Sequence, residues 1–163
     1  MNKTYLSLGS NRGDRTANLS KAVDLLSEWT GNIIIVSSLY ETSPWKMVDK
    51  TDFLNQVLLM ETTLPASELI DNIILIESMM GRLRTSKKYE PRIIDIDILL
   101  FNMEIINTRE LSVPHPLIRE RRFVLEPMAE IAPEFIHPVL KKSITQLLNE
   151  CEDKSEVRKL VSK

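Results

Sequence analysis

The spacing of hydrophobic residues along the chain changes repeatedly between the period of a strand and the period of a helix. Residues 3–8 predict a strand, which ends at the Gly9-Ser10-Asn11 turn. A helix follows, with Asp14 or Thr16 as its N-cap and Gly31 beyond its end. Its apolar stripe recurs at intervals of three and four residues and consists of Leu19, Ala22, Val23, Leu26 and Trp29.

The middle of the chain repeats this alternation. The β-branched residues of 33–42 predict a second strand, 43–52 form a polar loop, and 53–62 predict a third strand. Pro65 then opens a second helix, which is expected to stop near Gly81. The apolar content of this helix is Leu69, Ile70, Ile73, Ile74 and Ile76.

A strong strand over residues 93–101 completes the order strand, helix, strand, strand, helix, strand. This order predicts an α+β fold with a ferredoxin-like βαββαβ core. The C-terminal additions are a short strand near 104–107, a turn at Pro114-His115-Pro116, and helices near 121–130 and 143–151. Since the sequence contains no repeat, low-complexity tract or linker-like shift in composition, we expect residues 1–163 to form a single domain.

Composition limits the partners and the compartment. The net charge of −2 provides no overall field toward nucleic acid or an anionic membrane, so a bound anion requires a local positive cluster. Cys151 is the single cysteine, which excludes an internal disulfide and fits a reducing compartment. Residues 1–8 are too short and polar for a signal peptide, and no stretch reaches the roughly 20 apolar residues of a membrane span. We therefore expect a cytoplasmic protein.

Two aspartates interrupt the apolar strand at 93–101. Because side chains alternate between the faces of a strand, Asp95 and Asp97 point the same way, about 7 Å apart. Two carboxylates on one face repel each other unless a cation lies between them, and Mg²⁺ accepts a few carboxylates together with phosphate oxygens. Metal binding is the favoured interpretation, and decoration of a solvated sheet face is the alternative. The opposite face carries Ile94, Ile96, Ile98 and Leu100, which are expected to meet the helices.

Positive residues gather immediately upstream of this strand, and a second group follows it. An arginine offers paired donors to phosphate oxygens, although a solvated run of charges is the ordinary interpretation. The adjacency of cation-binding acids and phosphate-binding bases favours phosphoryl transfer. The sequence has no Gly-x-x-x-x-Gly-Lys pattern, so this is not a P-loop enzyme. The two groups are Arg82, Arg84, Lys87, Lys88 and Arg92, then His115, Arg119, Arg121 and Arg122.

Eight motifs, in order, resemble the 6-hydroxymethyl-7,8-dihydropterin pyrophosphokinase family, over roughly residues 5–148. The most specific is Pro91-Arg92-x-x-Asp95-Ile96-Asp97-Ile98-Leu99-Leu100. The others are Leu8-Gly9-Ser10-Asn11, Tyr40-Glu41-Thr42-x-Pro44, Asp52-Phe53-Leu54-Asn55, Gly81-Arg82-Leu83-Arg84, Val113-Pro114-His115-Pro116, Glu120-Arg121-Arg122-Phe123-Val124-Leu125 and Ala129-Glu130-Ile131-Ala132-Pro133.

The resemblance implies an ATP-dependent diphosphotransferase of folate biosynthesis, which releases AMP and uses two Mg²⁺ ions held by Asp95 and Asp97. The implied catalytic residues are Arg82, Arg92, Asp95 and Asp97. The implied ATP-binding residues are Glu77, Arg84, Arg92, Ile98, Ser112, His115 and Arg121. The implied pterin-binding residues are Thr42, Pro44, Trp45, Phe53, Asn55, Tyr89 and Phe123, with the two phenylalanines on either face of the ring.

Some positions depart from the family pattern, and other functions stay open. Tyr89 and Glu90 stand where tryptophan and glycine are common, and Trp45-Lys46 replaces a smaller residue followed by glycine. The alternatives are a two-metal phosphodiesterase or nuclease and a non-catalytic ferredoxin-like ligand-binding module. ATP and a reduced pterin are the expected small-molecule partners, without nucleic acid or membrane, and the expected state is a monomer or weak homodimer.

Overall fold

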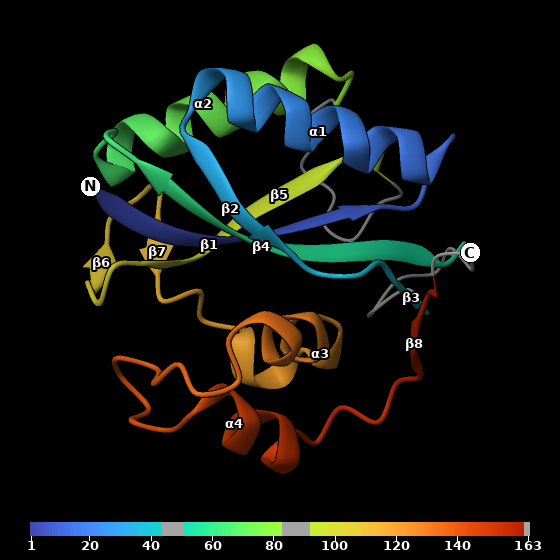
Figure 1. The fold of residues 1–163 in the computed structure, drawn as a ribbon, viewed down its shortest axis with the longest axis vertical. Helices are drawn as coiled ribbons and strands as arrows, with labels where there is room; N and C mark the ends of the chain where they lie inside the picture. Colours follow the sequence, from blue (N-terminus) through green and yellow to red (C-terminus); the bar gives the residue numbers. More distant parts are fainter. Residues whose placement is uncertain (44–50, 83–91, 162–163) are drawn as a thin grey trace.

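The computed structural model describes residues 1–43, 51–82 and 92–161. Within them a mostly antiparallel sheet lies between two helical layers, with α1 and α2 on one face and α3 and α4 on the other (Figure 1). The elements are β1 (Asn2–Ser10), α1 (Arg15–Trp29), β2 (Asn32–Val36), β3 (Tyr40–Thr42), β4 (Phe53–Thr62), α2 (Ala66–Met79), β5 (Asp95–Phe101), β6 (Ile106–Asn107), β7 (Ser112–Val113), a 3₁₀ turn η1 (Ile118–Glu120), α3 (Arg122–Ile131), α4 (Ile144–Glu150) and β8 (Val157–Lys159).

The sheet confirms the expected α+β, ferredoxin-like core. Its strand order is β5-β1-β4-β3-β8, and β2 also pairs with β4. β1 is antiparallel to β4 on one side and to β5 on the other, so the first strand lies between the last two strands of the βαββαβ core. The two-stranded β6–β7 ladder and the helices α3 and α4 are the C-terminal additions.

The first two predicted helices, α1 and α2, begin and end close to the expected residues. The Asp14 carboxylate caps α1 by accepting a hydrogen bond from the Ala17 N–H at 3.0 Å. Pro65 precedes α2, as expected. Gly81 follows α2 with φ of +92°, a left-handed conformation that favours glycine, and this turn directs the chain away from the helix axis toward Arg82.

The strand predicted over 33–42 is two strands. β2 pairs with the C-terminal half of β4, from Leu58 to Glu61, and β3 pairs with its N-terminal part, from Phe53 to Asn55. Between them, the Ser37 hydroxyl accepts a hydrogen bond from the Val57 N–H at 3.0 Å, in place of a backbone carbonyl. The ladder is therefore interrupted at Ser37, a change that strand propensity does not reveal.

The prediction for Leu100 is wrong. Ile94, Ile96 and Ile98 pack in the cluster beneath α1 and α2, as expected, but Leu100 belongs to the cluster formed with α3 and α4. The register with β1 passes from Tyr5↔Leu100 to Leu6↔Ile98, which leaves Leu99 as an extra residue. This β-bulge reverses the face on which the following side chain lies.

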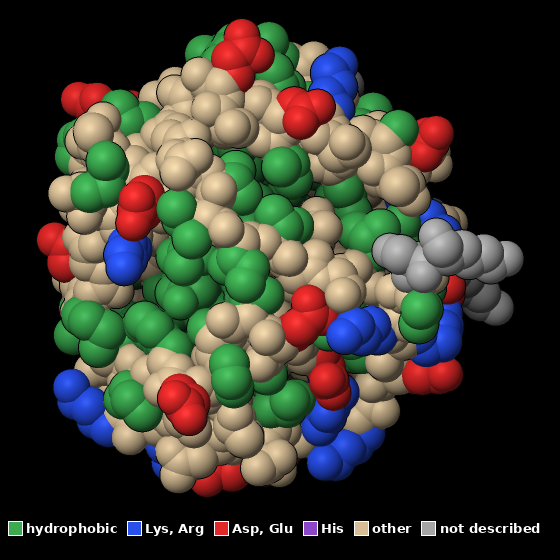
Figure 2. All heavy atoms as spheres, viewed as in Figure 1, with side chains coloured by type: hydrophobic (Ala, Val, Ile, Leu, Met, Phe, Trp, Pro, Cys, Tyr) green, Lys and Arg blue, Asp and Glu red, His purple; other side chains and the backbone are tan. Residues whose placement is uncertain are grey.

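Two further features complete the molecule. β8 pairs with the outer edge of β3, a strand that the sequence pattern does not predict. Figure 2 shows hydrophobic side chains gathered near the middle of the face on which β2 lies, and Ile34, Ile35 and Val36 of β2 are exposed. In the part of the chain that the structure describes, no helix is both long and apolar enough to cross a membrane.

Candidate active site

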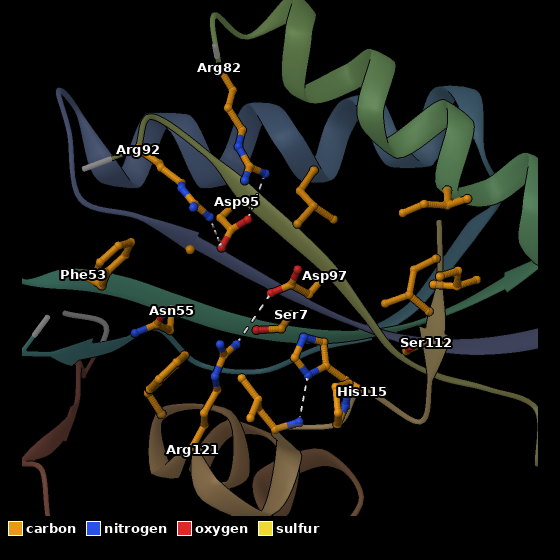
Figure 3. Close-up of a pocket in the computed structure, with 18 of the residues that line it drawn as sticks. Ser7, Phe53, Asn55, Arg82, Arg92, Asp95, Asp97, Ser112, His115 and Arg121 are labelled. Atoms are coloured by element: carbon orange, nitrogen blue, oxygen red, sulfur yellow. Dashed lines mark hydrogen bonds and ion pairs between the residues drawn. The ribbon is translucent and has the colours of Figure 1, made fainter. Parts of the chain in front are cut away.

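A cavity of about 530 Å³ opens between the sheet face formed by β5, β1 and β4 and the segment that contains η1 and the start of α3 (Figure 3). The cavity has a charged end around β5 and a neutral end around β3 and β4. Both ends take part of their side chains from strands that also carry the core, so the positions of these strand residues follow from strand register.

The charged end is built on Asp95 and Asp97. Their backbones pair with Gly9 and Ser7 of β1, and both carboxylates project into the cavity (Figure 3). The prediction that the two acids share a face is confirmed, and the face lines a cavity rather than a flat solvated sheet. Ser7 was missed by the sequence analysis, although its alternation with Leu6 and Leu8 along β1 could have identified it.

Three arginines converge on this pair from two sides (Figure 3). The Arg82 and Arg92 guanidiniums contact the two oxygens of Asp95 at 2.9 Å and 3.2 Å. From the opposite side, a guanidinium nitrogen of Arg121 lies 4.0 Å from Asp97. Both basic groups of the sequence thus contribute to one site. Arg122 does not, because it binds Glu126 and Asp153.

Glu77 lies beneath the charged end and does not line the cavity. Its buried carboxylate accepts a hydrogen bond from the Ile96 N–H at 2.9 Å and is ion-paired with Arg82. The predicted contact of Glu77 with ATP stays a prediction. In this structure Glu77 fixes the guanidinium of Arg82 against β5.

Burial, followed by the negative charge of Asp95, raises the pKa of Asp97 to about 7, against the opposing effect of Arg121. A buried carboxylate whose charged form is disfavoured in this way is stabilised by a nearby cation. Among the described residues no group of three or more acidic, histidine or cysteine side chains forms a closed metal site.

His115 borders the same end of the cavity. The cis Val113–Pro114 peptide lies in the turn that the sequence predicted. Burial, followed by the charge of Arg121, lowers the pKa of His115 to about 4, so the ring is neutral at physiological pH. Its Nδ1 accepts a hydrogen bond from the Leu117 N–H at 3.1 Å, which leaves the ring proton on Nε2 as a donor. Ile98 and Ser112 also line the cavity, as predicted.

The neutral end contains a fixed amide and two aromatic rings. The buried Asn55 side chain donates a hydrogen bond from Nδ2 to the Thr42 hydroxyl at 2.7 Å. Phe53 and Phe123 both line the cavity and are only partly buried, and Phe123 also packs against the core cluster formed with α3 and α4. Gly9 lies against this group, because a Cβ at Gly9 would stand 3.1 Å from Asn55 Oδ1.

Four predicted site residues fall outside the described residues: Arg84 among the ATP contacts, and Pro44, Trp45 and Tyr89 among the pterin contacts. The cavity is also lined by residues that were not predicted to belong to the site. They include Ile70 and Ile74 of α2 and the segment Glu110-Leu111 before β7. Ile70 and Ile74 had been assigned to the apolar stripe of α2, and no local signal separates a core isoleucine from one that lines a cavity.

The fold and the site together define a ferredoxin-like α+β protein with a single cavity that is charged at one end and neutral and aromatic at the other. Residues 5–133 match the family described as 7,8-dihydro-6-hydroxymethylpterin-pyrophosphokinase (HPPK). The chain belongs to this family.

Known proteins that resemble the chain agree with this assignment. It is 41% identical to a 2-amino-4-hydroxy-6-hydroxymethyldihydropteridine pyrophosphokinase of Aquifex aeolicus, over 90% of each chain. It is 46% identical to the protein of that name in Bacillus subtilis, over 80% of this chain and 78% of the relative. A crystal structure of wild-type Plasmodium falciparum HPPK-DHPS superposes with a TM-score of 0.73 at 22% identity, over 91% of this chain. This chain spans 41% of that longer one, and the likeness concerns the fold.

Proposed function

We propose that this pocket transfers the diphosphate of ATP to the hydroxymethyl group of 6-hydroxymethyl-7,8-dihydropterin and releases AMP, a step of folate biosynthesis. Family membership supports the reaction. The observation that assigns it to this pocket is that Asp95, Asp97 and three arginines face the same cavity as Asn55 and two phenylalanines. One cavity thus offers a polyphosphate site and a site for a flat heterocycle.

Magnesium fits the charged end. Mg²⁺ prefers oxygen ligands and takes one or two carboxylates, completing its shell with water and substrate phosphates. Asp95 and Asp97 are neighbouring carboxylates on the cavity wall, and their mutual repulsion favours a cation. We infer that these two residues hold two Mg²⁺ ions, which would neutralise charge on the phosphates of ATP during transfer.

The basic residues bind and orient the triphosphate. Arg82 and Arg92 occupy one side of the acid pair and Arg121 the other, so donors can reach phosphate oxygens from two directions. The Nε2–H of neutral His115 is a further donor. Ser112 lies on the side of Asp97 away from Asp95 (Figure 3), where the rest of the nucleotide would lie, and Ile98 lines the same cavity.

The neutral end orients the acceptor. A pterin is planar, apolar on its faces and rich in donors and acceptors along its edge. Phe53 and Phe123 offer rings to the faces, and Asn55 and Thr42 offer an amide and a hydroxyl to the edge. The hydroxymethyl group would then point toward the charged end, where its oxygen attacks the β-phosphorus of ATP and AMP departs with the bridging oxygen.

Catalysis in this arrangement depends on positioning and charge stabilisation. Phosphoryl transfer needs little covalent chemistry from the protein, because holding attacking and leaving oxygens in line supplies most of the acceleration. Arg82 and Arg92 stabilise the charge of the transferred diphosphate.

The decisive experiment follows the nucleotide product. The protein is incubated with ATP, Mg²⁺ and 6-hydroxymethyl-7,8-dihydropterin, and nucleotides are separated by chromatography. AMP should form in equal amount to a pterin whose mass has increased by a diphosphate. Release of ADP would indicate a monophosphate kinase. Release of nucleotides from DNA without pterin would indicate the nuclease alternative, and binding without turnover would indicate a ligand-binding module.

The chain's organisation and location are also inferred. We propose that residues 1–163 act as one domain, because a single sheet connects the N-terminal strand to β8.

A single buried cysteine and the use of ATP support a cytoplasmic location. The net charge of −2 argues against nucleic acid or an anionic membrane as a partner. Exposed Ile34 and Ile35 on β2 offer a small self-contact, compatible with a monomer or weak homodimer.

A further inference from the structure

Behind the neutral end, on the side of the sheet away from the cavity, Glu41 stands between two arginines. Thr42 of β3 faces Asn55 in the pocket, and Glu41, one residue earlier, therefore points the other way. Its Oε2 lies 2.9 Å from Arg15 and its Oε1 lies 3.0 Å from Arg158. One carboxylate thus joins the first turn of α1 to β8.

The same two arginines also hold Asp52, immediately before β4. Arg158 Nη2 donates to the Asp52 carboxylate at 3.1 Å, and Arg15 Nη1 donates to the Asp52 backbone carbonyl at 2.9 Å. We call Arg15, Glu41, Asp52 and Arg158 the clasp. It consists of two cations and two anions, so its formal charges cancel.

The clasp fixes the place where β3 and β4 meet at the pocket. Glu41 pairs with Leu54 and Thr42 pairs with Phe53 in the β3–β4 ladder. Glu41 immediately precedes Thr42, and Asp52 immediately precedes Phe53, so both acids are adjacent to the Thr42–Phe53 pair. The backbone positions of Thr42 and Phe53 are therefore held from behind by the clasp and from beside by β8, whose Val157 pairs with Thr42.

This support is needed because β3 is short. It has three residues, and a short ladder specifies register weakly unless side chains secure it. The Asn55–Thr42 hydrogen bond exists only in this register. An isolated surface ion pair contributes little, but a network of half-buried arginine–carboxylate contacts at good distances is the exception. The two arginines also lower the pKa of Glu41, Arg158 first, which keeps the carboxylate ionised.

We propose that the clasp residues are positioning residues for the pterin, which set the separation of Thr42, Phe53 and Asn55 from behind the sheet. The inference rests on the proposed function. The charged end should be insensitive to the clasp, because Asp95 and Asp97 are held by the β1–β5 ladder and by their own arginines. The clasp therefore acts on recognition of one substrate and not of the other.

The test compares kinetic constants for the two substrates in variants of Arg158. Arg158→Ala removes the contacts with Glu41 and Asp52, together with an ion pair to the exposed Glu156. We expect the KM for 6-hydroxymethyl-7,8-dihydropterin to rise about tenfold, with kcat and the KM for ATP changing less than about twofold. Arg158→Lys keeps the charge but cannot bridge two carboxylates in a fork, so it should restore only part of the loss. Lys142→Ala, which breaks the exposed Lys142–Glu150 pair on another part of the surface, is the matched control and should change neither KM.

A near-isosteric variant guards against loss of folding. Glu41→Gln keeps the shape of the side chain, and direct titration of the pterin should show weaker binding with unchanged binding of Mg²⁺-ATP. Equal losses for both substrates, or a lower melting temperature with unchanged pterin affinity, would overturn the inference by showing a merely structural role. Wild-type protein that forms no AMP would instead refute the proposed function, and the pterin titrations would then decide the inference alone.

Discussion

The two ends of the cavity are built in different ways. At the charged end, long side chains hold one another: Arg82 and Arg92 lie on Asp95, and Arg121 lies near Asp97. At the neutral end the contacting groups are short and buried, and the backbone register of β3 and β4 places Asn55 against Thr42.

This difference indicates how each end responds to substrate. A triphosphate and its cations can replace the internal ion pairs of the charged end, because each arginine exchanges one oxygen ligand for another. The neutral end has little freedom to adapt, so its selectivity depends on geometry formed before binding. Substitutions should accordingly affect rate at one end and affinity at the other.

The largest expected effect is that of Asp97→Asn. Loss of a metal-binding carboxylate should lower kcat by about 1,000-fold or more, because charge on the transferring phosphates loses its neutralisation. Steady-state AMP formation at saturating substrates measures this effect. Retention of near-wild-type turnover would show that the acid pair does not hold the catalytic cations.

The same variant should be more stable without metal. Because the folded-state pKa of Asp97 is raised to about 7, from 3.8, the folded protein binds a proton more tightly than the unfolded chain does. Ionised Asp97 therefore destabilises the fold, fully above about pH 7 and not below about pH 4. Thermal melting in EDTA should show that Asp97→Asn raises the melting temperature at pH 8 and has little effect at pH 4. A lower melting temperature at pH 8 would contradict the repulsion between the two acids.

Arg82 and Arg92 allow a sharper comparison within the charged end. Alanine at either position should reduce kcat by about 100-fold, with a smaller change in pterin affinity, since each stabilises developing charge. Only Arg82→Ala should also lower the melting temperature, because it removes the ion-pair partner of buried Glu77, whereas Arg92 has no such buried contact among those described. Equal melting temperatures for the two variants would show that Glu77 does not depend on Arg82. Unchanged kcat with weakened pterin binding would remove Arg92 from the catalytic residues.

Gly9→Ala tests the rigidity of the neutral end. The new methyl group would lie 3.1 Å from Asn55 Oδ1, so the Asn55 amide must move by a few tenths of an ångström, whereas its distance of 3.5 Å to Phe53 is an ordinary van der Waals contact. We expect the KM for pterin to rise about tenfold while the KM for ATP is unchanged. Pterin titration followed by fluorescence provides an independent measurement. An unaltered pterin affinity would mean that this end can adjust after all.

The smallest effect is expected at Glu130, which secures the neutral end from α3. Its carboxylate accepts hydrogen bonds from the Tyr40 hydroxyl and the Ser38 N–H, both at 2.7 Å. Burial raises its pKa, but these bonds outweigh burial and the pKa is lowered below 4.5. The stabilisation is therefore present above pH 4.5 and is lost as the pH falls through the lower folded value. Glu130→Gln should reduce the melting temperature slightly at pH 7 and not at pH 3. The same decrease at both pH values would exclude an ionic contribution.

The charged end could be predicted from the sequence because it depends on local periodicity. Asp95 and Asp97 are two residues apart on a strand, and that spacing alone determines that they share a face. The helix cap at Asp14 and the stop near Gly81 also follow from neighbouring residues.

The remaining features depend on partners far away in the sequence. The interruption at Ser37 depends on Val57, and the strand at 157–159 exists because β3 offers it an edge. The position of Glu77 beneath the cavity depends on Ile96 and Arg82, and its predicted contact with ATP stays a prediction. In each case the contact lies in the tertiary structure and leaves no periodic trace.

Because of the extra residue at Leu99, the two parts of β5 have different surroundings. Before it, one side of the strand is the wall of an open cleft, and after it, both sides are sealed within the protein. Loss of a single residue there would force half of the strand to turn over, and acids would exchange places with isoleucines. The length of the strand at this point is therefore as much a requirement of the site as the identity of its acids.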